Sequence, residues 1–451
     1  GETKDLIVYA DINSSAAGTG TVAAYVAGTT VSSATSVTAG ISASTTDVLG
    51  QSIVFTAGTF TPAVDGTTPL SQIVAGGQQV VAGKFKFTTR YDSYTIKELR
   101  FTIGTAADSS AINSAIVKDG DTTLATVNYD STNSYFNITG LNVSVPANTS
   151  KVLTLAYNLS STVSSDSGNS QVDLKPTLSY VKYATSQGTE SCIGTGCTDT
   201  TTYATGKELY VFRSIPTVTK DTSITGTGVS LAGTPTIDLY GWKINADTKG
   251  DIKVKQIKFT LSLNDAGGDS SLYLYGFKLY KGLTDISSLV TITDEDGHNL
   301  KTTTAADGAN ESSTQIIVYW SESPYEDTIT AGTTSTYKLT ATASGFITNS
   351  TTKVAGDDTI SINLASDTSV NAAANKYVGL TNATPGGYAM LRASTASTGA
   401  TAANFIWSDN SALSHAATDV AYTSTATSSG DWANGYLVQS LPLSTTSFVG
   451  P

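Results

Sequence analysis

Apolar and polar residues alternate with a period of two along almost the whole chain, and this pattern restricts the chain to β-structure. It is clear in Lys84–Ile103, KFKFTTRYDSYTIKELRFTI, where two alternating runs flank a polar turn. Successive side chains of a β-strand point to opposite faces, so such runs bury one face and expose the other. Apolar residues at helical spacing are hard to find. The pattern therefore predicts strands with one face in a core.

The same alternation predicts further strands, separated by clusters of Gly, Asp, Asn and Ser. They are Ser150–Leu159, Lys207–Ile215, Gly250–Leu261, Ser271–Tyr280 and Thr314–Trp320. Val, Ile, Thr, Tyr and Phe supply these runs, and such side chains pack well on a pleated sheet. We therefore expect an all-β protein with tandem Ig-like antiparallel β-sandwich domains in an elongated arrangement.

Three sequence blocks recur, which indicates that the sandwiches repeat one unit. In one of them, Gly50–Val64 with its counterpart Gly206–Lys220, an apolar strand runs into a Pro-containing extended segment, which suits a linker or a sheet edge. The aligned pairs are Gln78–Ile103 with Thr236–Leu261, Val145–Ser161 with Ile329–Gly345, and Gly50–Val64 with Gly206–Lys220.

The chain begins with a strand-like segment, GETKDLIVYADINSS, which aligns with Asn148–Ser161 of the second block. We therefore expect residues 1–60 to form a partial β-sandwich unit with a possible donor or acceptor segment. Residues 61–213 are predicted to form one β-sandwich repeat. Residues 214–451 are predicted to form a larger repeat with a Trp-containing C-terminal extension. No signal peptide leads the sequence, which we take to be that of a mature form.

The composition excludes several classes of function. The 451 residues include 37 acidic and 25 basic side chains, a net charge of −12. This balance argues against binding nucleic acid, whose phosphates attract basic proteins. No apolar run reaches the roughly 18 residues of a membrane-spanning helix. The many β-branched and aromatic residues argue against disorder. We expect a folded chain with no nucleic-acid partner and no membrane span.

Cys192 and Cys197 are the only cysteines, and they lie in a loop rich in Gly and Thr, ESCIGTGCTDT. A zinc site would need two more soft ligands nearby, but His298 and His415 are the only histidines. The spacing also differs from that of a redox Cys-x-x-Cys motif. We therefore predict a disulfide that closes a small loop. A disulfide indicates an oxidising compartment, and so export from the cell.

The sequence contains none of the common catalytic motifs, neither Gly-x-Ser-x-Gly nor His-Glu-x-x-His nor a P-loop. A histidine-based hydrolase would need His298 or His415 beside a serine and a carboxylate, and nothing in the local sequence suggests this. We therefore predict no enzyme and no catalytic residues. The carboxylate pair of a glycosidase stays open as an alternative, because its spacing is not readable from a sequence.

One polar segment, TDEDGHNL, places Asp294, Asp296 and Asn299 around Gly297. Calcium prefers such oxygen ligands, so these three residues are the candidate metal ligands, and calcium is the only cofactor suggested. The segment departs from an EF-hand loop, because it lacks a third acid before the glycine and a glutamate at the far end. The alternative is a hairpin with an Asp-Gly turn that needs no metal.

The strand SLYLYGFKLY, Ser271–Tyr280, is apolar on both faces. We interpret it as a central strand of a sandwich core, with a sugar-stacking platform and a subunit contact as alternatives. Uninterrupted alternation puts Tyr273, Tyr275, Phe277 and Leu279 on one face, and Leu272, Leu274 and Tyr280 on the other.

Aromatic residues near both ends of the chain are candidates for contacts between subunits, where Trp and Tyr are favoured. Trp407 and Trp432 are predicted to lie in loops beside Asp409 and Asp431, where they cap the last sandwich or anchor a neighbouring subunit. The candidate interface residues are Leu6, Val8, Tyr9, Trp407, Trp432 and Tyr436.

Asn-x-Ser/Thr sequons mark candidate glycosylation sites of a glycoprotein. A chain so rich in Ser and Thr contains about this many by chance, so the sequons mark sites without establishing any. One sequon is at Asn13, and the other seven are the candidate sites: Asn137, Asn142, Asn148, Asn158, Asn310, Asn349 and Asn382.

Several of these segments resemble secreted tandem β-sandwich surface proteins, S-layer-like or appendage components, of candidate phyla radiation (Patescibacteria) bacteria. The resemblance is carried by FIWSDNSA with DWANGYLVQSLP, and by the block from VVAG and KFKF to IKELRFTI; it covers roughly residues 50–445. It implies an exported component of a surface layer or appendage without catalytic residues. Members of this group usually extend further at the N-terminus than this chain does.

Together these features predict a non-catalytic structural subunit of an extracellular, cell-surface polymer of the filament or pilus type. Copies of the chain would join head to tail by β-strand donation, with Gly1–Ser15 or Gly435–Phe448 as the donor. One alternative is an S-layer lattice in which calcium locks lateral contacts. Another is an adhesin or carbohydrate-binding module that binds cell-surface glycans or a host cell surface. The expected partners are therefore copies of the chain itself, with glycans as the alternative.

Overall fold

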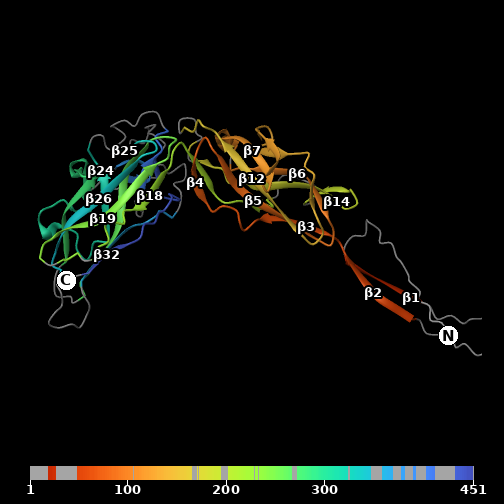
Figure 1. The fold of residues 1–451 in the computed structure, drawn as a ribbon, viewed down its shortest axis with the longest axis horizontal. Coiled ribbons are helices and arrows are strands. Elements are labelled where there is room, and N and C mark those ends of the chain that lie inside the picture. Colours follow the sequence, from red (N-terminus) through yellow and green to blue (C-terminus); the bar gives the residue numbers. More distant parts are fainter. Residues whose placement is uncertain are drawn as a thin grey trace, which may run out of the picture.

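Two β-sandwiches follow each other along the long axis of the molecule in the computed structural model (Figure 1). Nearly all elements are strands in antiparallel sheets, which confirms the predicted all-β fold of tandem sandwiches. The structure describes residues 19–26, 48–104, 106–164, 170, 172–193, 202–227, 229–231, 233–266, 272–322, 326–346, 358–368, 377–380, 390–392, 403–411 and 432–449.

The first sandwich packs two sheets around fully buried rings such as Phe87, Phe136 and Tyr157. One sheet has the order β3 (Thr59–Val64), β5 (Gln79–Arg90), β12 (Ser150–Leu159), β7 (Ile112–Asp119) and β8 (Thr122–Val127). The other has the order β15 (Glu190–Cys192), β14 (Thr177–Thr185), β6 (Tyr94–Thr102), β10 (Tyr135–Ile138) and β9 (Tyr129–Asp130). The short strands β11 (Val143–Val145) and β16 (Ala204–Thr205) pair with β6 and β14.

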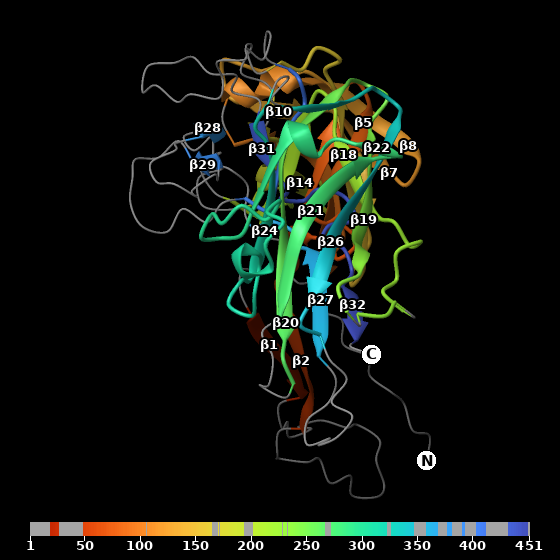
Figure 2. The ribbon, with the colours of Figure 1, turned by 90° about the vertical axis from the view of Figure 1, so that its left-hand side faces the viewer.

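The second sandwich is built in the same way around Trp242, Phe259 and Trp320. One sheet has the order β18 (Pro216–Lys220), β19 (Thr236–Ala246), β26 (Thr334–Ser344), β21 (Tyr273–Lys281) and β22 (Thr284–Asp285). Figure 2 shows the long strands of this layer side by side. The other has the order β23 (Val290–Thr293), β24 (Gln315–Trp320), β20 (Ile252–Asn264), β27 (Thr359–Leu364) and β32 (Thr446–Val449). The strands β25 (Asp327–Ile329) and β30 (Phe405–Ser408) pair with β20, and β31 (Trp432–Asn434) pairs with β30.

The aligned sequence blocks occupy equivalent places in the two sandwiches. The first block forms β5 and β6 in one sandwich and β19 and β20 in the other. The second block supplies β12 and β26, each the middle strand of its five-stranded sheet. The third block forms β17 (Leu209–Phe212) followed by β18, and, earlier in the chain, β2 (Val48–Thr56) followed by β3. The repeats are therefore structural as well as sequence repeats.

Outside the sandwiches, β1 (Thr19–Val26) and β2 form a hairpin that projects from the first sandwich, away from the second (Figure 1). Residue 60, the predicted end of the first unit, falls inside β3, which pairs with β5. Residue 213 falls between β17 and β18. The remaining elements are the hairpin of β28 (Tyr377–Leu380) and β29 (Met390–Arg392), and the 3₁₀ helices η1 (Ala106–Ala111), η3 (Ser287–Leu289) and η4 (Ala305–Asp307).

The two candidate donor segments have different outcomes. Gly1–Ser15, with Leu6, Val8 and Tyr9, lies outside the described residues. The other candidate, Gly435–Phe448, is already part of its own sandwich: β32 pairs with β27, and Leu443 and Phe448 are buried in the core. Its prediction as a free donor strand is therefore wrong, because this sandwich uses its apolar side chains. Within the described part of the chain, no helix has the length and hydrophobicity needed to cross a membrane.

Candidate functional site: the junction between the sandwiches

A three-stranded sheet lies between the two sandwiches, in the order β13 (Val172–Asp173), β17 and β4 (Gln72–Ala75). The strands β17 and β4 run parallel. Side chains of β17 alternate between two cores. Leu209 and Val211 pack in the first core, whereas Tyr210 and Phe212 pack in the second. One strand therefore supplies both hydrophobic cores, and the two sandwiches share it.

Aromatic packing closes this junction. The rings of Phe212 and Trp407 lie with their centroids 4.9 Å apart, and both side chains are buried. The indole nitrogen of Trp407 donates a hydrogen bond to the Asn434 carbonyl oxygen, 2.8 Å away. Its buried polar atom is thus satisfied, as a buried indole requires. Trp407 joins the second sandwich to β17 of the first.

A buried carboxylate ties three segments together at the same place. Asp409 is fully buried, and its Oδ2 accepts hydrogen bonds from the Ser170 hydroxyl at 2.7 Å and the Arg213 backbone N–H at 2.8 Å. Its Oδ1 accepts bonds from the backbone N–H and hydroxyl of Ser411. Hydrogen bonds to a charged acceptor are among the stronger ones, and the loss of a partner inside a protein is costly. The carboxylate therefore holds the chain segments of both sandwiches in one arrangement.

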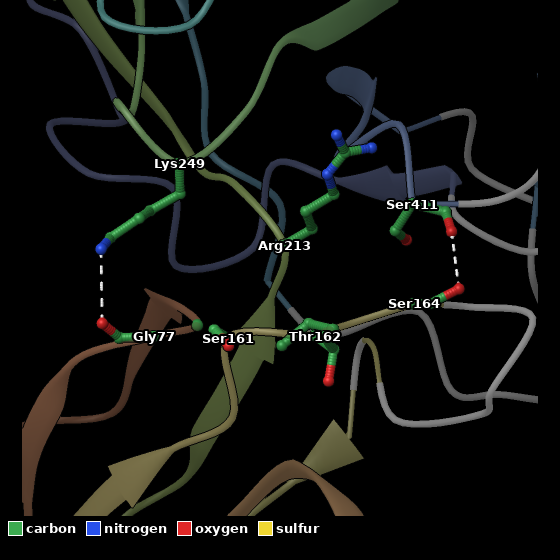
Figure 3. A pocket seen from close by; sticks show the side chains of 9 residues that line it. Gly77, Ser161, Thr162, Ser164, Arg213, Lys249 and Ser411 are labelled. Carbon is green, nitrogen blue, oxygen red and sulfur yellow. Dashed lines mark hydrogen bonds between the residues drawn. The ribbon is translucent and has the colours of Figure 1, made fainter.

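A cleft of about 480 Å³ opens at the rim of the junction, lined by residues of both sandwiches. In Figure 3, Lys249 of the second sandwich reaches the Gly77 carbonyl oxygen of the first, 3.3 Å away. On the other side the Ser164 hydroxyl donates to the Ser411 carbonyl oxygen at 2.9 Å. The Arg213 guanidinium donates to the Asn410 carbonyl oxygen. The bonds of Lys249 and Ser164 therefore link the two sandwiches across the cleft.

Tyr436 makes another contact across the junction. Its hydroxyl donates to the Glu208 carboxylate at 2.8 Å, just before β17 begins. Partial burial, followed by the hydrogen bond and the charge of Glu208, raises the pKa of the Tyr436 hydroxyl. The hydroxyl therefore stays protonated at neutral pH and keeps its role as donor. This contact adds to the same connection between the sandwiches.

The candidate interface residues of the C-terminal extension therefore serve contacts within one chain. Trp407 and Tyr436 bind the first sandwich, and Trp432 is 4% exposed in a small cluster with Tyr319 and Ile406. This burial contradicts the predicted role of Trp407 and Trp432 as surface anchors for another subunit, whereas for the partly buried Tyr436 that role stays a prediction. Trp407 and Trp432 also lie in strands β30 and β31 instead of loops.

The predicted calcium ligands lie in a turn in which Asp294 and Asn299 already accept hydrogen bonds. Asp294 is buried, and its Oδ1 accepts bonds from the backbone N–H groups of Asp296 and His298. Its Oδ2 lies 2.8 Å from His298 Nδ1 and 3.3 Å from the Ser313 hydroxyl. Asn299 Oδ1 accepts the Lys301 N–H. Within the described ranges, no three His, Cys, Asp or Glu side chains gather as a metal site. Calcium binding stays a prediction that these contacts do not favour.

The other predicted sites are placed as follows. Cys192, at the end of β15, is disulfide-bonded, and Cys197 lies outside the described residues, as does His415. Asn142 and Asn148 are exposed, whereas Asn137, Asn158 and Asn310 are partly buried. The Asn158 side-chain nitrogen donates to the Ser114 hydroxyl, so that amide is occupied. Asn349 and Asn382 lie outside the described residues.

The aromatic strand β21 departs from uninterrupted alternation. A β-bulge lies between Tyr275 and Lys278, and Gly276 adopts φ of +60° there, a value that favours glycine. As a result Leu274, Phe277 and Leu279 all point into the core. Tyr273, Tyr275 and Tyr280 are partly exposed. The predicted division of faces is therefore wrong after Tyr275, because the extra residue shifts the register.

Sequence reasoning did not identify the junction residues Tyr210, Phe212 and Arg213. Its one signal is the run Leu209–Phe212, four apolar residues in a row, whereas a strand with one exposed face would alternate. Asp409 was noted only as a neighbour of Trp407, because nothing in its local sequence indicates burial.

Known proteins show only distant similarity to this chain. No protein-family model matches the chain, and no curated protein matches it. A solved structure described as BspA_C_mut matches 68% of this chain and 94% of its own, at 8% identity and a TM-score of 0.18. A BSP domain of a biofilm-associated protein matches 69% of this chain and 64% of its own, at 8% identity and a TM-score of 0.18. Likeness at this level supports no conclusion, and the resemblance to surface proteins of candidate phyla radiation bacteria stays a prediction.

Proposed function

We propose that this chain is an extracellular, non-catalytic structural protein of a cell surface, in which the two sandwiches act as one stiff rod. The observation that carries the proposal is the sharing of β17 by both cores. A flexible tether would join the domains by an exposed polar linker. Here the connecting strand is buried on both faces.

Bending at the junction would expose apolar side chains to water. Ile73, Tyr210 and Phe212 come from the strands between the sandwiches, yet they pack in the second core. Exposing a large apolar side chain costs about 1.5–3 kcal/mol. Three such side chains, together with the buried Asp409, favour one fixed orientation of the sandwiches. A fixed orientation suits a protein that carries load or spaces other groups away from a surface.

The assembly that we propose is head to tail, through the hairpin of β1 and β2. Among the described residues these strands pair only with each other, so both outer edges of the hairpin are unpaired. Unpaired strand edges are templates for another chain. In the aligned blocks β2 stands where β17 stands, and β17 is held between β4 and β13. We propose that β2 takes the equivalent place at the end of a neighbouring copy.

Electron microscopy of the native material tests this function. Negatively stained preparations should contain filaments, and antibodies should label the surface of intact producing cells. Deleting Gly1–Thr56 should leave soluble monomers. Deleting only Gly1–Ile12 shows whether the leading segment is the donor. Filaments of unchanged geometry from both deletions would refute strand donation, and unlabelled cells with monomers in the medium would refute the surface role.

The same preparations distinguish the filament from the alternative, an S-layer lattice. Such a lattice would appear as sheets, and removal of calcium with a chelator would dissolve it. The saturated hydrogen bonding of Asp294 gives no support to a calcium-locked lattice, so we favour the filament.

A further inference from the structure

A groove of about 400 Å³ crosses the outer face of the β19–β26–β21 sheet in the second sandwich, and its lining shares no residue with the junction cleft. Its walls include the partly exposed rings of Tyr275 and Tyr280, and the bulge at Gly276 brings Tyr280 onto the same outer face as Tyr275. Threonines of β26 lie between them. The groove thus combines aromatic faces with a polar floor.

The charged groups of the groove balance one another. Lys338 Nζ lies 3.0 Å from Asp238 Oδ1 and 5.3 Å from the centroid of the Tyr280 ring. Lys278 lies 3.7 Å from Asp285. Each lysine therefore has an acidic partner, Asp238 within the lining and Asp285 beside it, so both positive charges of the groove are paired. This balance favours an uncharged ligand over a phosphate, an acidic peptide or a basic one.

A buried hydroxyl at this place lacks a partner. Thr340 lines the groove opposite Lys278 in the strand ladder, and its Oγ1 is buried without a hydrogen-bond partner among the described residues. An unsatisfied buried hydroxyl is unfavourable. A ligand hydroxyl that reaches this atom would provide the missing partner.

The fold itself does not require these two tyrosines, because the first sandwich has other residues at the corresponding positions. In the second sandwich Lys338 pairs with Tyr280, and the corresponding pair of the first sandwich is Thr154 with Lys118. Tyr275 pairs with Thr342, and the corresponding pair is Ser114 with Asn158. In the first sandwich Asn158 donates to Ser114 and accepts from Gln79, and Lys118 donates to Gln79. The tyrosines are therefore particular to the second repeat.

We propose that this groove binds an uncharged saccharide. A pyranose ring has a face of C–H groups that packs on an aromatic ring, and a rim of hydroxyls that both donate and accept hydrogen bonds. Tyr275 and Tyr280 supply the aromatic surfaces. Asp238 accepts, Lys338 donates, and the threonine hydroxyls do both. The volume lies in the range of small-ligand sites and accommodates one or two sugar rings.

A glycan array probed with the full chain tests the proposal, followed by titration calorimetry with the neutral oligosaccharide that binds best. The wild-type protein should bind to neutral oligosaccharides on the array. Tyr275→Ala and Tyr280→Ala should each weaken binding roughly tenfold, because each removes one stacking surface. Tyr280→Phe should keep the affinity within roughly threefold, since the ring remains. Both tyrosines are partly exposed, so the variants should melt at the wild-type temperature.

The first sandwich provides matched controls. Ser114→Ala and Lys118→Ala change the corresponding outer face and should leave the affinity unchanged. The proposal is overturned if the array retains no neutral glycan above the level of the Tyr275→Ala/Tyr280→Ala double variant. It is also overturned if the controls lose as much affinity as the tyrosine variants, or if only charged glycans bind.

Discussion

Replacing Phe212 with alanine tests whether the junction couples the two sandwiches. Phe212 belongs to β17, whose neighbours Leu209 and Val211 lie in the first core. Its own ring is 3% exposed and packs on Trp407 in the second core. The main-chain bonds from β17 to β4 and β13 do not depend on this ring. The substitution should therefore remove the coupling while β17 stays in place.

The size of the effect follows from the burial of the ring. Truncating a buried Phe to Ala costs about 3–5 kcal/mol, which includes the cavity that is left. The contact between the Phe212 and Trp407 rings supplies about 0.5–1.5 kcal/mol of this. In a unit of this size each kcal/mol lowers the melting temperature by about 2–4 °C. We therefore expect the second sandwich to melt roughly 10 °C earlier in the variant.

Differential scanning calorimetry measures this prediction directly. The wild type should unfold both sandwiches in one transition, because separation of the cores is unfavourable, whereas Phe212→Ala should show two. Phe136→Ala is the matched control, since Phe136 is fully buried in the first core and does not reach the second. It should destabilise the chain by a similar amount without separating the transitions. A wild type with two independent transitions, or a Phe212→Ala variant with an unchanged melting profile, would refute the coupling.

Three other changes test separate parts of the structure. Asp409→Asn should lower the free energy of unfolding by about 1–3 kcal/mol in urea denaturation, because an amide cannot accept the bonds of Ser170, Arg213 and Ser411 together; an unchanged midpoint would argue against the role of this carboxylate. The hydrogen bond to Asp294, and then its charge, raises the pKa of His298 above 6.5, so this contact stabilises the fold fully below pH 6.5 and is lost as the pH rises through the folded pKa. NMR titration should show the raised pKa for His298, and His298→Asn should remove this small pH dependence of the melting temperature. Gly226→Ala should increase hydrogen exchange in β32, because the new Cβ would lie 2.3 Å from the Ser447 carbonyl oxygen at a φ of +72°. Gly233→Ala, with a φ of +75° and nothing within 4 Å, isolates the backbone strain and should leave β32 protected.

Much of the fold is predictable from the sequence because alternation and repetition are local signals. The predicted strand Ser150–Leu159 has the same bounds as β12, and Thr314–Trp320 differs from β24 by one residue. The division of faces along β21 was not predictable, since a single extra residue at Gly276 reverses it without changing the composition. The junction escaped prediction for another reason. Its contacts join Asp409 to Ser170 and Arg213, over separations of 239 and 196 residues, and no periodic pattern connects such positions.

The repeat alignment extends the argument about β17 to β2, and with it to assembly. The run Leu209–Phe212 is apolar at every position and is buried on both faces. The aligned strand β2 carries Ile53, Val54 and Phe55 in succession, which is typical of burial on both faces. An isolated two-stranded hairpin has too little surface to bury both faces of a strand, so this run favours a further partner.

The substitution Val54→Lys places a charge in this run and tests the inference. If β2 is buried in a neighbouring copy, as β17 is buried within the chain, an unpaired charge there should prevent polymers. Sedimentation and negative-stain microscopy should then find monomers. The melting temperature should be unchanged, because β2 pairs only with β1 in the described part of a single chain. Ser52→Lys, at a polar position of the same strand, should still polymerise. Normal filaments from Val54→Lys would mean that β2 stays exposed in the assembly, and the head-to-tail contact must then be sought elsewhere on the chain.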